Sequence, residues 1–332
     1  MKNMSDVPEI PGCEIIAGLQ KGGMATVYLG VQKTLNRKVA VKILEASLLE
    51  DEDTATRFAR EAQTAASLAH SNIIQIFDAG RVRDYHYIMM EYLEETLRDR
   101  MKRYPDYRMH PEIAIDIVEE MMKALDYAHF KGVYHRDIKP DNIMFRQDST
   151  PVLTDFGIAR VFDNADRLTK SNMIMGTVDY MSPEQCNAEQ DIDGRSDTYS
   201  LGVVLYEMLT GETPYTGNSQ LSVAIQHIEK PVPKLPHDLS RYQLLIDNMM
   251  AKERENRLSS GPEFDRVLYI ILTGSADPVS LPLESGPVTE EIPMPEDLEP
   301  FQLEDYNLSS PEKIPSTSIF KKLKGAMKSL FS

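Results

Sequence analysis

The spacing of apolar positions in the first 90 residues is that of β-strands rather than helices. Short alternating or apolar runs predict strands over 27–31, 39–44, 73–77 and 87–90. Between the second and third runs, an acidic stretch from Glu50 precedes apolar side chains at three- to four-residue spacing, from Phe58 to Ala69. Acidic side chains are favourable at a helix N-terminus, so this stretch predicts one helix. The N-terminal part is therefore expected to be a small β-rich lobe.

After residue 95 the apolar spacing becomes helical. Pro111 begins a run with apolar side chains along one face, and Gly132 follows its end. Residues 196–210 are apolar on nearly every side and stop at Gly211, which is typical of a helix buried all round. The sequence thus predicts an α+β fold of two lobes, in which a small β-rich N-lobe with one key helix precedes a larger α-helical C-lobe.

The composition changes after Leu272. Residues 278–315 contain eight of the 20 prolines, and residues 267–312 contain ten acidic residues and no basic one. Such a stretch cannot bury enough apolar surface to offset the entropy of ordering it, so 274–317 is predicted to be a disordered, acidic, Pro-rich linker. In 318–332 apolar side chains recur at helical spacing among four lysines, which predicts a basic amphipathic segment. It would lie on an anionic membrane surface, dock in a partner groove or on the acidic domain itself, or have no function.

The overall charge narrows the classes of partner. With 36 Lys and Arg against 52 Asp and Glu, the formal net charge is −16, which argues against nucleic acid and against broad binding to anionic membranes. Two cysteines, Cys13 and Cys186, exclude a disulfide framework and fit a reducing compartment. The N-terminal residues lack the apolar stretch of a signal peptide, and the longest apolar run, 267–272, is too short to span a membrane. A cytoplasmic protein, at most peripheral at the inner face of a membrane, is the expectation.

Three short motifs suggest phosphoryl transfer. Residues 134–142 read Tyr-His-Arg-Asp-Ile-Lys-Pro-Asp-Asn, an Asp-Phe-Gly motif begins at Asp155, and a Val-Ala-Val-Lys motif ends at Lys42. Phosphoryl transfer from ATP needs few protein groups, and these motifs supply them. Lys42 on a predicted strand would neutralise the α- and β-phosphates. Glu61 on the predicted helix would orient that lysine.

The remaining groups would act at the transferred phosphoryl group. Asp137 would accept the proton of the substrate hydroxyl, and Lys139 would stabilise charge on the group in transfer. Asn142 and Asp155 would hold Mg²⁺ through their oxygen atoms, the ligand type that this ion prefers. Any one of these motifs alone is common in ordinary structure, but all of them in this order and at these intervals indicate a catalytic site.

Together the motifs resemble those of eukaryotic-type (Hanks-type) Ser/Thr protein kinases, most of all the bacterial branch. The segments GGMATVY, FAREAQTAASLAHSNIIQIFDAG, SPEQ and DGRSDTYSLGVVLYEMLTGETPYTG support that branch. The resemblance implies a protein kinase domain over about residues 12–273, with an N-lobe over 12–92 and a C-lobe over 93–273. An N-terminal arm over 1–11 would precede it.

The resemblance also implies where ATP would bind. The family's glycine-rich loop is only partly matched, because its three glycine positions hold Gln20, Gly22 and Ala25. Gly22 would let backbone N–H groups approach the phosphates. Met90 would be the gatekeeper, and backbone groups of Glu91 and Leu93 would bind adenine. The residues implied around ATP are Leu19, Gly22, Val27, Ala40, Lys42, Met90, Glu91, Leu93 and Met144.

An activation segment from Asp155 to Glu184 is implied as well. Thr169 and Ser171 lie where bacterial relatives autophosphorylate, and a phosphate there would pair with Arg136. Thr177 would hydrogen-bond to Asp137 and Lys139, as is typical of Ser/Thr kinases.

Two buried contacts would hold this segment and the catalytic turn. Glu184 would form an ion pair with Arg257, and Asp197 would bind the backbone of the turn that contains residues 135–137. His135 and Phe156 are expected to be structural members of a hydrophobic spine.

The expected function is an active protein Ser/Thr kinase that uses ATP and Mg²⁺, with Mn²⁺ as an alternative metal. Its substrates would be Ser and Thr hydroxyls of proteins, and the family suggests a homodimer formed through the small lobe. A different class of function, a pseudokinase acting as a nucleotide-binding scaffold, is supported only by Gln20 and Ala25. A small-molecule kinase fits less well, because Ser182-Pro183-Glu184 and Gly176-Thr177 suit a platform for polypeptides.

Overall fold

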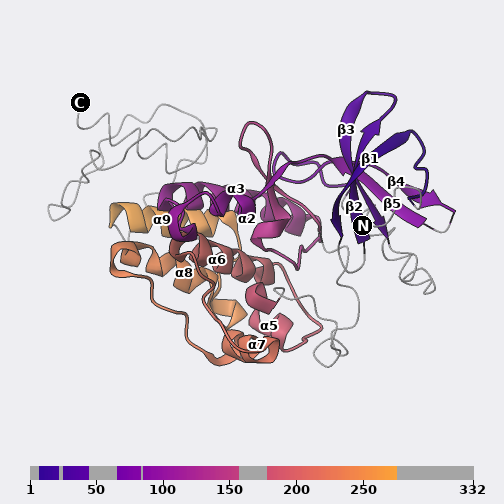
Figure 1. Ribbon diagram of the computed structural model, residues 1–332. Helices are drawn as coiled ribbons and strands as arrows, with labels where there is room; N and C mark the ends of the chain where they lie inside the picture. The colour runs from indigo at the N-terminus through magenta and orange to yellow at the C-terminus, as the bar shows by residue number, and fades with distance from the viewer. Residues whose placement is uncertain (1–6, 22–24, 45–65, 84, 157–177, 275–332) are drawn as a thin grey trace, which may run out of the picture.

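The computed structural model has two lobes, a β-sheet lobe and a helical lobe (Figure 1). The structure describes residues 7–21, 25–44, 66–83, 85–156 and 178–274. The predicted α+β fold of two lobes is therefore confirmed. The predicted helix around 50–69 falls almost wholly outside the described residues, as do nearly all of the predicted linker and the whole basic segment at 318–332.

The N-lobe is a five-stranded antiparallel sheet with the order β1-β2-β3-β5-β4. Its strands are β1 (Cys13–Lys21), β2 (Ala25–Gln32), β3 (Arg37–Leu44), β4 (Ile76–Val82) and β5 (Tyr85–Glu91). The central strands alternate between two apolar layers. Val39, Val41 and Ile43 face one cluster with Tyr28 and Met89, whereas Ala40 and Leu44 face the other. The alternation of β3 in the sequence thus decides which residues face the second lobe.

One strand prediction needs correction, and one strand was not predicted. β4 begins at Ile76, so the strand predicted over 73–77 is only partly right. Ile73 and Ile74 are buried by a different contact, because Ile73 forms an isolated bridge with Leu153 and the amide of Ile74 donates to the Leu153 carbonyl at 2.9 Å. An apolar run alone cannot distinguish these two kinds of burial. The strand β1, between residues 13 and 21, was not singled out from the sequence.

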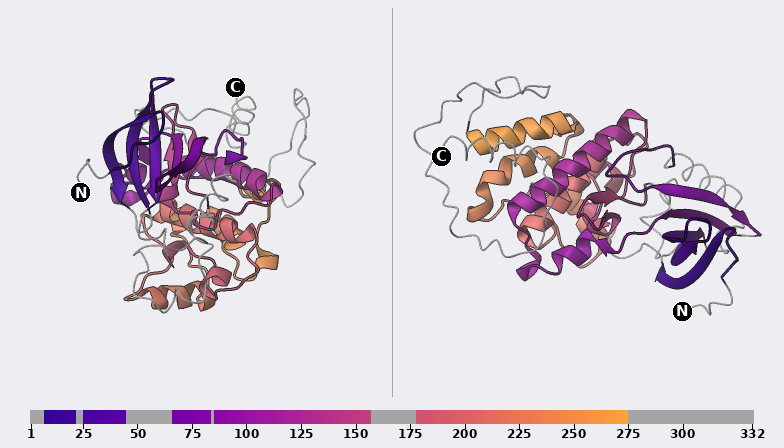
Figure 2. Two further views of the ribbon diagram at one scale, coloured as in Figure 1. Left: turned by 90° about the vertical axis from the view of Figure 1, so that its right-hand side faces the viewer. Right: turned by 90° about the horizontal axis from the view of Figure 1, so that it is seen from above.

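The C-lobe is built around two long helices that contact each other, α3 and α6 (Figures 1 and 2). Its helices are α2 (Leu97–Met101), α3 (Pro111–Phe130), α5 (Pro183–Cys186), α6 (Arg195–Thr210), α7 (Gln220–Glu229), α8 (Gln243–Met249) and α9 (Gly261–Thr273). Short 3₁₀ helices are η3 (Pro105–Tyr107), η4 (Pro140–Asn142), η5 (Val178–Tyr180), η6 (His237–Tyr242) and η7 (Arg254–Asn256). None of the described helices is long and apolar enough to cross a membrane.

The helix α6 is buried all round, as its sequence predicted. Thirteen of its 16 residues are buried. It packs closely on α8, since a Cβ at Gly202 would lie 2.8 Å from the Cβ of Met249. The helix ends at Gly211, which has a φ of 83°, and a Cβ there would lie 2.0 Å from the carbonyl oxygen of Asp106. Only glycine fits that end of the helix.

A small second sheet joins the two lobes and carries the candidate catalytic residues. It has the order β6-β7-β8, with β6 (Glu95–Thr96), β7 (Ile143–Phe145) and β8 (Pro151–Leu153). The turn η4 runs directly into β7, and Asp155 follows β8 by two residues. These strands are too short to be recognised from the spacing of apolar residues in the sequence, yet they bring the motif at 134–142 close to Asp155 and Phe156.

Candidate active site

The turn at residues 135–137 is organised by a buried carboxylate. Asp197, near the N-terminus of α6, is 1% exposed. It accepts hydrogen bonds from the amides of His135 at 2.8 Å and Arg136 at 2.6 Å, and from Nε2 of His129 at 2.8 Å. Burial alone would raise the pKa of Asp197, but the bond and charge of His129 outweigh it, so its pKa is lowered. An ionised Asp197 thus fixes a turn in which Arg136 has a φ of 61°.

His135 connects this turn to the Asp-Phe-Gly motif. Its Nε2 donates to the carbonyl of Thr154 at 2.8 Å, its Nδ1 accepts from the amide of Asp137 at 3.3 Å, and its ring lies 4.7 Å from that of Phe156. One ring nitrogen donates and the other accepts, which is the pattern of a neutral imidazole. Burial lowers the pKa of His135 and so favours this neutral form. His135 therefore lies in a structural position between two loops.

The Asp137 carboxylate is held from two sides. Nζ of Lys139 donates to Oδ2 of Asp137 at 2.9 Å, and Nδ2 of Asn142 donates to the same oxygen at 3.0 Å and to the Asp137 carbonyl at 2.8 Å. The side chain of Asp137 keeps 23% of its surface exposed. A carboxylate that is fixed and still reachable can accept a proton from a hydroxyl group of a bound substrate.

Lys42 of the N-lobe and Asp155 of the C-lobe form an ion pair of 2.7 Å. Burial alone would raise the pKa of Asp155, but the charge and hydrogen bond of Lys42 act in the opposite direction and the pKa is lowered, so that Asp155 is ionised. The sequence had paired Lys42 with Glu61, which lies outside the described residues. The contact of Lys42 with Asp155 was missed because nothing in the sequence brings residues 113 positions apart together.

The donor set fits a magnesium ion. Thr154 donates through its amide and its hydroxyl to the Asn142 carbonyl, at 2.9 and 3.2 Å, and so fixes Asn142 beside Asp155. Asn142 and Asp155 offer an amide oxygen and an ionised carboxylate, which are hard oxygen ligands. Among the described residues no group of three or more His, Cys, Asp and Glu side chains could hold a metal. The two oxygen ligands of Asn142 and Asp155 suit Mg²⁺, which keeps water and phosphate oxygens in its coordination shell.

The residues implied around adenine gather in one apolar cluster between the lobes. Its buried members include Ala40, Met90 and Leu93, and Val27 and Met144 pack against it half-buried. Leu19 lies apart from the buried core and is 46% exposed, and Gly22 lies outside the described residues.

The hinge between the lobes, residues 91–93 at the end of β5, is fixed by contacts that sequence reasoning missed. The amide of Glu91 donates to the carbonyl of Gln75 at 2.9 Å. The carboxylate of Glu91 accepts two bonds from Arg146, at 2.6 and 2.9 Å, and Arg146 also bonds to the carbonyl of Ser71. Arg146 immediately follows β7, so it ties the hinge to the small sheet.

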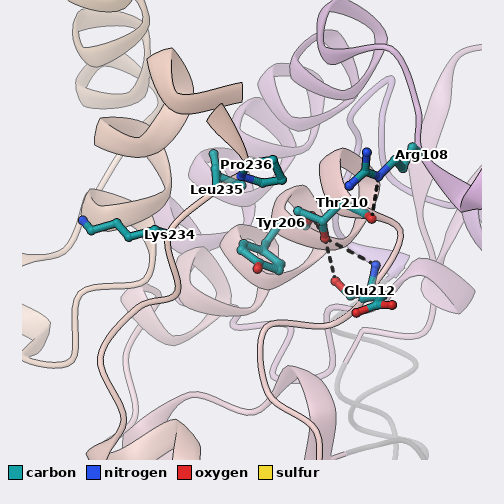
Figure 3. A pocket seen from close by; sticks show the side chains of 7 residues that line it. All are labelled: Arg108, Tyr206, Thr210, Glu212, Lys234, Leu235 and Pro236. Carbon is teal, nitrogen blue, oxygen red and sulfur yellow. Dashed lines mark hydrogen bonds between the residues drawn. The ribbon is translucent and has the colours of Figure 1, made fainter. Parts of the chain in front are cut away.

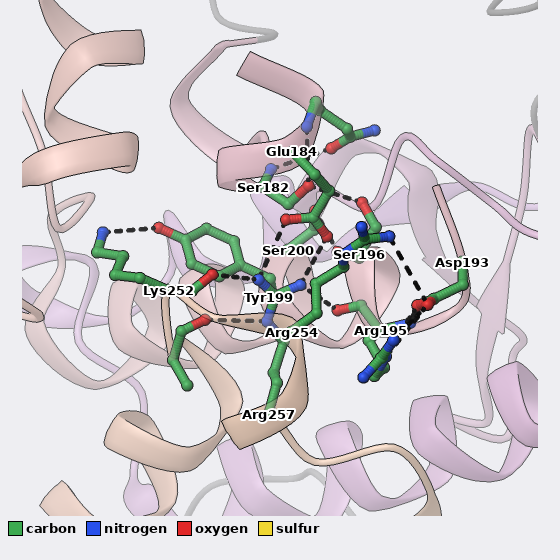
Figure 4. Close-up of polar contacts among 12 residues, drawn as sticks. Ser182, Glu184, Asp193, Arg195, Ser196, Tyr199, Ser200, Lys252, Arg254 and Arg257 are labelled. Carbon is green, nitrogen blue, oxygen red and sulfur yellow. Dashed lines mark hydrogen bonds and ion pairs between the residues drawn. The ribbon is translucent and has the colours of Figure 1, made fainter. Parts of the chain in front are cut away.

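The end of the implied activation segment is tied to the C-lobe by a buried ion pair (Figure 4). Nη1 and Nη2 of Arg257 donate to the two carboxylate oxygens of Glu184 at 2.7 and 3.1 Å, and the two side chains are 0% and 2% exposed. The expected Glu184–Arg257 contact is thus present. Ser182 also caps α5 with a capping box. Three further residues assigned to this segment, Thr169, Ser171 and Thr177, lie outside the described residues.

A separate hollow of about 340 Å³ lies near the end of α6 (Figure 3). It is lined by Arg108, Tyr206, Thr210, Glu212, Lys234, Leu235 and Pro236. None of the residues assigned to ATP, metal or catalysis from the sequence lines it, and Arg108 bonds to the carbonyl of Thr210 within its wall, at 3.0 Å. The hollow is therefore distinct from the site around Asp137.

Comparison with known proteins agrees with this geometry. Serine/threonine-protein kinase PknB of Mycobacterium tuberculosis is 42% identical over 266 residues, which cover 76% of this chain and 42% of that protein. A probable serine/threonine-protein kinase PknB of Bifidobacterium longum is 38% identical over 272 residues, which cover 76% of this chain and 39% of that protein. The matched region is thus less than half of the length of these relatives.

Solved structures and the family model give the same assignment. A crystal structure of a mutant of the M. tuberculosis PknI kinase domain aligns with a TM-score of 0.64 and 26% identity, over 82% of this chain and 100% of that one. Residues 14–267 match the model of the protein kinase domain family. Since that match covers most of the chain, and the lobes, the fixed Asp137 and the Lys42–Asp155 pair accompany it, the chain belongs to the protein kinase family.

Proposed function

We propose that this chain is an active protein Ser/Thr kinase that uses ATP and Mg²⁺. The observation that carries the proposal is the convergence of Asp137, Lys139 and Asn142 with the Lys42–Asp155 pair, from both lobes. The pseudokinase alternative gains no support beyond Gln20 and Ala25, because the lysine, the candidate base and the candidate metal ligands are all present.

The residues would divide the work of phosphoryl transfer. The Asp137 carboxylate would orient the Ser or Thr hydroxyl and take its proton, while the ammonium of Lys139, 2.9 Å away, would balance the charge. Lys42 and Asp155, which neutralise each other here, would turn to the phosphates and the metal respectively when nucleotide binds. Bound Mg²⁺ would neutralise charge that develops on the phosphoryl oxygens. The apolar cluster with Ala40 and Met90 would cover adenine.

The test is a measurement of mass by intact-protein mass spectrometry after incubation with ATP and Mg²⁺. Wild-type protein should gain phosphate and label casein, whereas Asp137→Asn should do neither, because an amide cannot take the proton. Equal thermal stability of the two proteins is the control for folding. If neither protein gains phosphate nor labels casein, the kinase assignment is wrong for this chain.

Autophosphorylation at Thr169 and Ser171 is part of the proposal. Peptide mapping of wild-type protein should place phosphate on one or both, and a variant with both Thr169→Ala and Ser171→Ala should lose most of the mass gain. Phosphate found only elsewhere in the chain would contradict this assignment. Arg136, beside the candidate base, is the proposed partner of the phosphate.

For the basic segment at 318–332 we propose an anionic membrane surface as the partner, which would make a cytoplasmic protein peripheral at the inner face. Its four lysines and its apolar residues at helical spacing support the proposal. Sedimentation with vesicles of anionic lipid should carry down the full chain and not a form that lacks these residues. Equal binding of both forms would remove the membrane proposal. A homodimer is a further proposal from the family, and light scattering of the full chain tests it.

A further inference from the structure

One partly buried arginine lies beside the candidate catalytic loop and has no part in the chemistry proposed above. The guanidinium of Arg98, on α2, donates to the Glu207 carboxylate on α6 and to the hydroxyl of Tyr180 on η5. Tyr180 in turn donates to Oε2 of Glu207 at 2.6 Å. Nε of Arg98 lies 3.6 Å from the carboxylate of Asp141 on η4. One side chain thus joins four elements.

The position of Arg98 is fixed by its own helix. Its neighbour Leu97 and Met101, one turn on, are fully buried in the C-lobe core. Thr96 caps the helix by accepting from the amide of Asp99 at 3.0 Å. The short helix α2 therefore places this guanidinium in the network rather than letting it move in solvent.

Carboxylates outnumber cations around this guanidinium. Glu207 is nearly buried, and the side chain of Asp141 is 50% exposed. Asp179 is the third carboxylate and faces both Glu207 and Arg98. Burial and the charge of Glu207 raise the pKa of Asp179, whereas the charge of Arg98 lowers it. The charge of Lys102 also acts on Asp141, but Arg98 is the cation that faces all three carboxylates, and its side chain keeps 26% of its surface exposed. Without that cation, the three carboxylates would form a site for a positively charged group that is open to solvent.

This network borders the place where a protein substrate must lie. Asp141 is followed directly by Asn142, whose amide donates to the Asp137 carboxylate. Arg98 thus contacts Asp141, and the residue after Asp141 in the chain touches the candidate base. A substrate whose hydroxyl reaches Asp137 would bring its neighbouring residues past Asp141, since successive residues of an extended chain are about 3.5 Å apart.

We propose that Arg98 is a specificity-determining residue, which fills from within the chain the place where a basic side chain of the substrate would bind. The kinase then has no preference for substrates with arginine or lysine close to the acceptor hydroxyl on this side. The proposal rests on the proposed kinase function. It assigns to Arg98 a role in the choice of substrate and none in the chemical step.

The test uses the full-length protein and an array of peptides with one threonine acceptor. Arginine or alanine occupies, in turn, each position within about four residues of the acceptor. The measured quantity is the ratio of kcat/KM for the arginine peptide to that for the alanine peptide. Wild-type protein should give ratios below about 3 at every position, whereas Arg98→Ala should give about 10 or more at one position, the tenfold effect of one charged contact.

Three further variants make the result specific. Arg98→Gln keeps hydrogen-bond donors near Glu207 and Tyr180 but removes the charge, so it should give the same new preference even where Arg98→Ala folds poorly. Arg98→Ala combined with Glu207→Gln should lose most of it. Lys234→Ala, in the hollow that is distinct from the site around Asp137 and paired with Asp247 at 3.4 Å, should behave as wild type.

The outcomes separate this inference from the proposed function. If wild-type protein phosphorylates the array and neither Arg98 variant changes any ratio, the specificity role is wrong while the kinase function stands. A wild-type preference of tenfold or more for arginine at the position affected by Arg98→Ala would also overturn it. If wild-type protein phosphorylates no peptide and no protein, the kinase function itself fails, and the inference fails with it.

Discussion

The buried pair of Glu184 and Arg257 allows a prediction with a calculable size. Arg257 gives five hydrogen bonds: two go to Glu184, and three go to the carbonyl oxygens of Arg195, Ala251 and Lys252 at 2.8, 3.0 and 3.2 Å. Because both side chains are almost fully buried, Arg257→Met leaves an uncompensated carboxylate in the core. Breaking such a pair from one side costs about 3–5 kcal/mol of unfolding free energy.

That loss is large enough to measure by thermal unfolding of the full chain. In a protein of this size, about 1 kcal/mol shifts Tm by roughly 2–4 °C, so Tm should fall by roughly 6–20 °C. Combining Arg257→Met with Glu184→Gln should cost less than the sum of the two single changes, by about 2 kcal/mol, since each single change already breaks the pair.

A neighbouring arginine provides the control. Arg254 lies on the adjacent 3₁₀ helix and pairs at 3.3 Å with Glu189, whose side chain is 40% exposed. Arg254→Ala should cost clearly less than Arg257→Met, because the side chains of Arg254 and Glu189 keep 23% and 40% of their surface exposed and solvent screens the charge that is left. If Arg257→Met costs less than about 1 kcal/mol, or if the double change is simply additive, the Glu184–Arg257 pair does not hold this segment.

Three further outcomes are expected. Gly211→Ala should lower stability by about 3 kcal/mol or more, because its Cβ would meet the Asp106 carbonyl oxygen at 2.0 Å. Gly132→Ala is the control: Gly132 has a φ of 75° but nothing within 4 Å of the added Cβ, so this change should cost about 1 kcal/mol. Equal losses of the two variants in urea unfolding would contradict this prediction. Burial and the charge of Lys252 lower the pKa of His227 from 6.5 to about 3 in the folded protein. Between these pH values the unfolded chain binds a proton at His227 and the folded protein does not, so the free energy of unfolding should fall as pH drops from about 6.5 towards 3. His227→Gln should flatten that decline, replacement of the exposed His110 should not, and an unchanged slope for both would refute the assignment. Mg²⁺ and ATP at about 100 times their Kd should stabilise wild-type protein by roughly 2.7 kcal/mol and Asp155→Asn by clearly less, as seen in Tm; equal shifts would exclude Asp155 from the nucleotide site.

The order of elements could be predicted because it depends on local patterns. The strand period around Val39 and Val41 and the helical period after Pro111 are written in neighbouring residues, and both elements were found. The uniform burial of α6 was predicted from its composition alone. By contrast, the strand predicted over 73–77 was misplaced in part, because the burial of Ile73 comes from Leu153, far along the chain.

The candidate catalytic residues were also readable from the sequence, since their types and intervals suffice to suggest the chemistry. Their partners were not. The pairing of Lys42 with Asp155, of Glu91 with Arg146 and of Arg98 with Glu207 each joins residues more than 50 positions apart. Such contacts depend on how the two lobes and the small sheet pack, and no local period encodes them.

The sequence by itself therefore determined the class of fold, the candidate chemistry and a total charge that disfavours nucleic acid. Only the tertiary structure decided which charged side chains pair with each other. It holds Asp197 ionised beneath the catalytic turn, keeps His135 neutral and sets Arg98 against three carboxylates beside Asp137. The physical reason is that the strength of an electrostatic contact depends on distance and burial, and both arise only when the chain has folded.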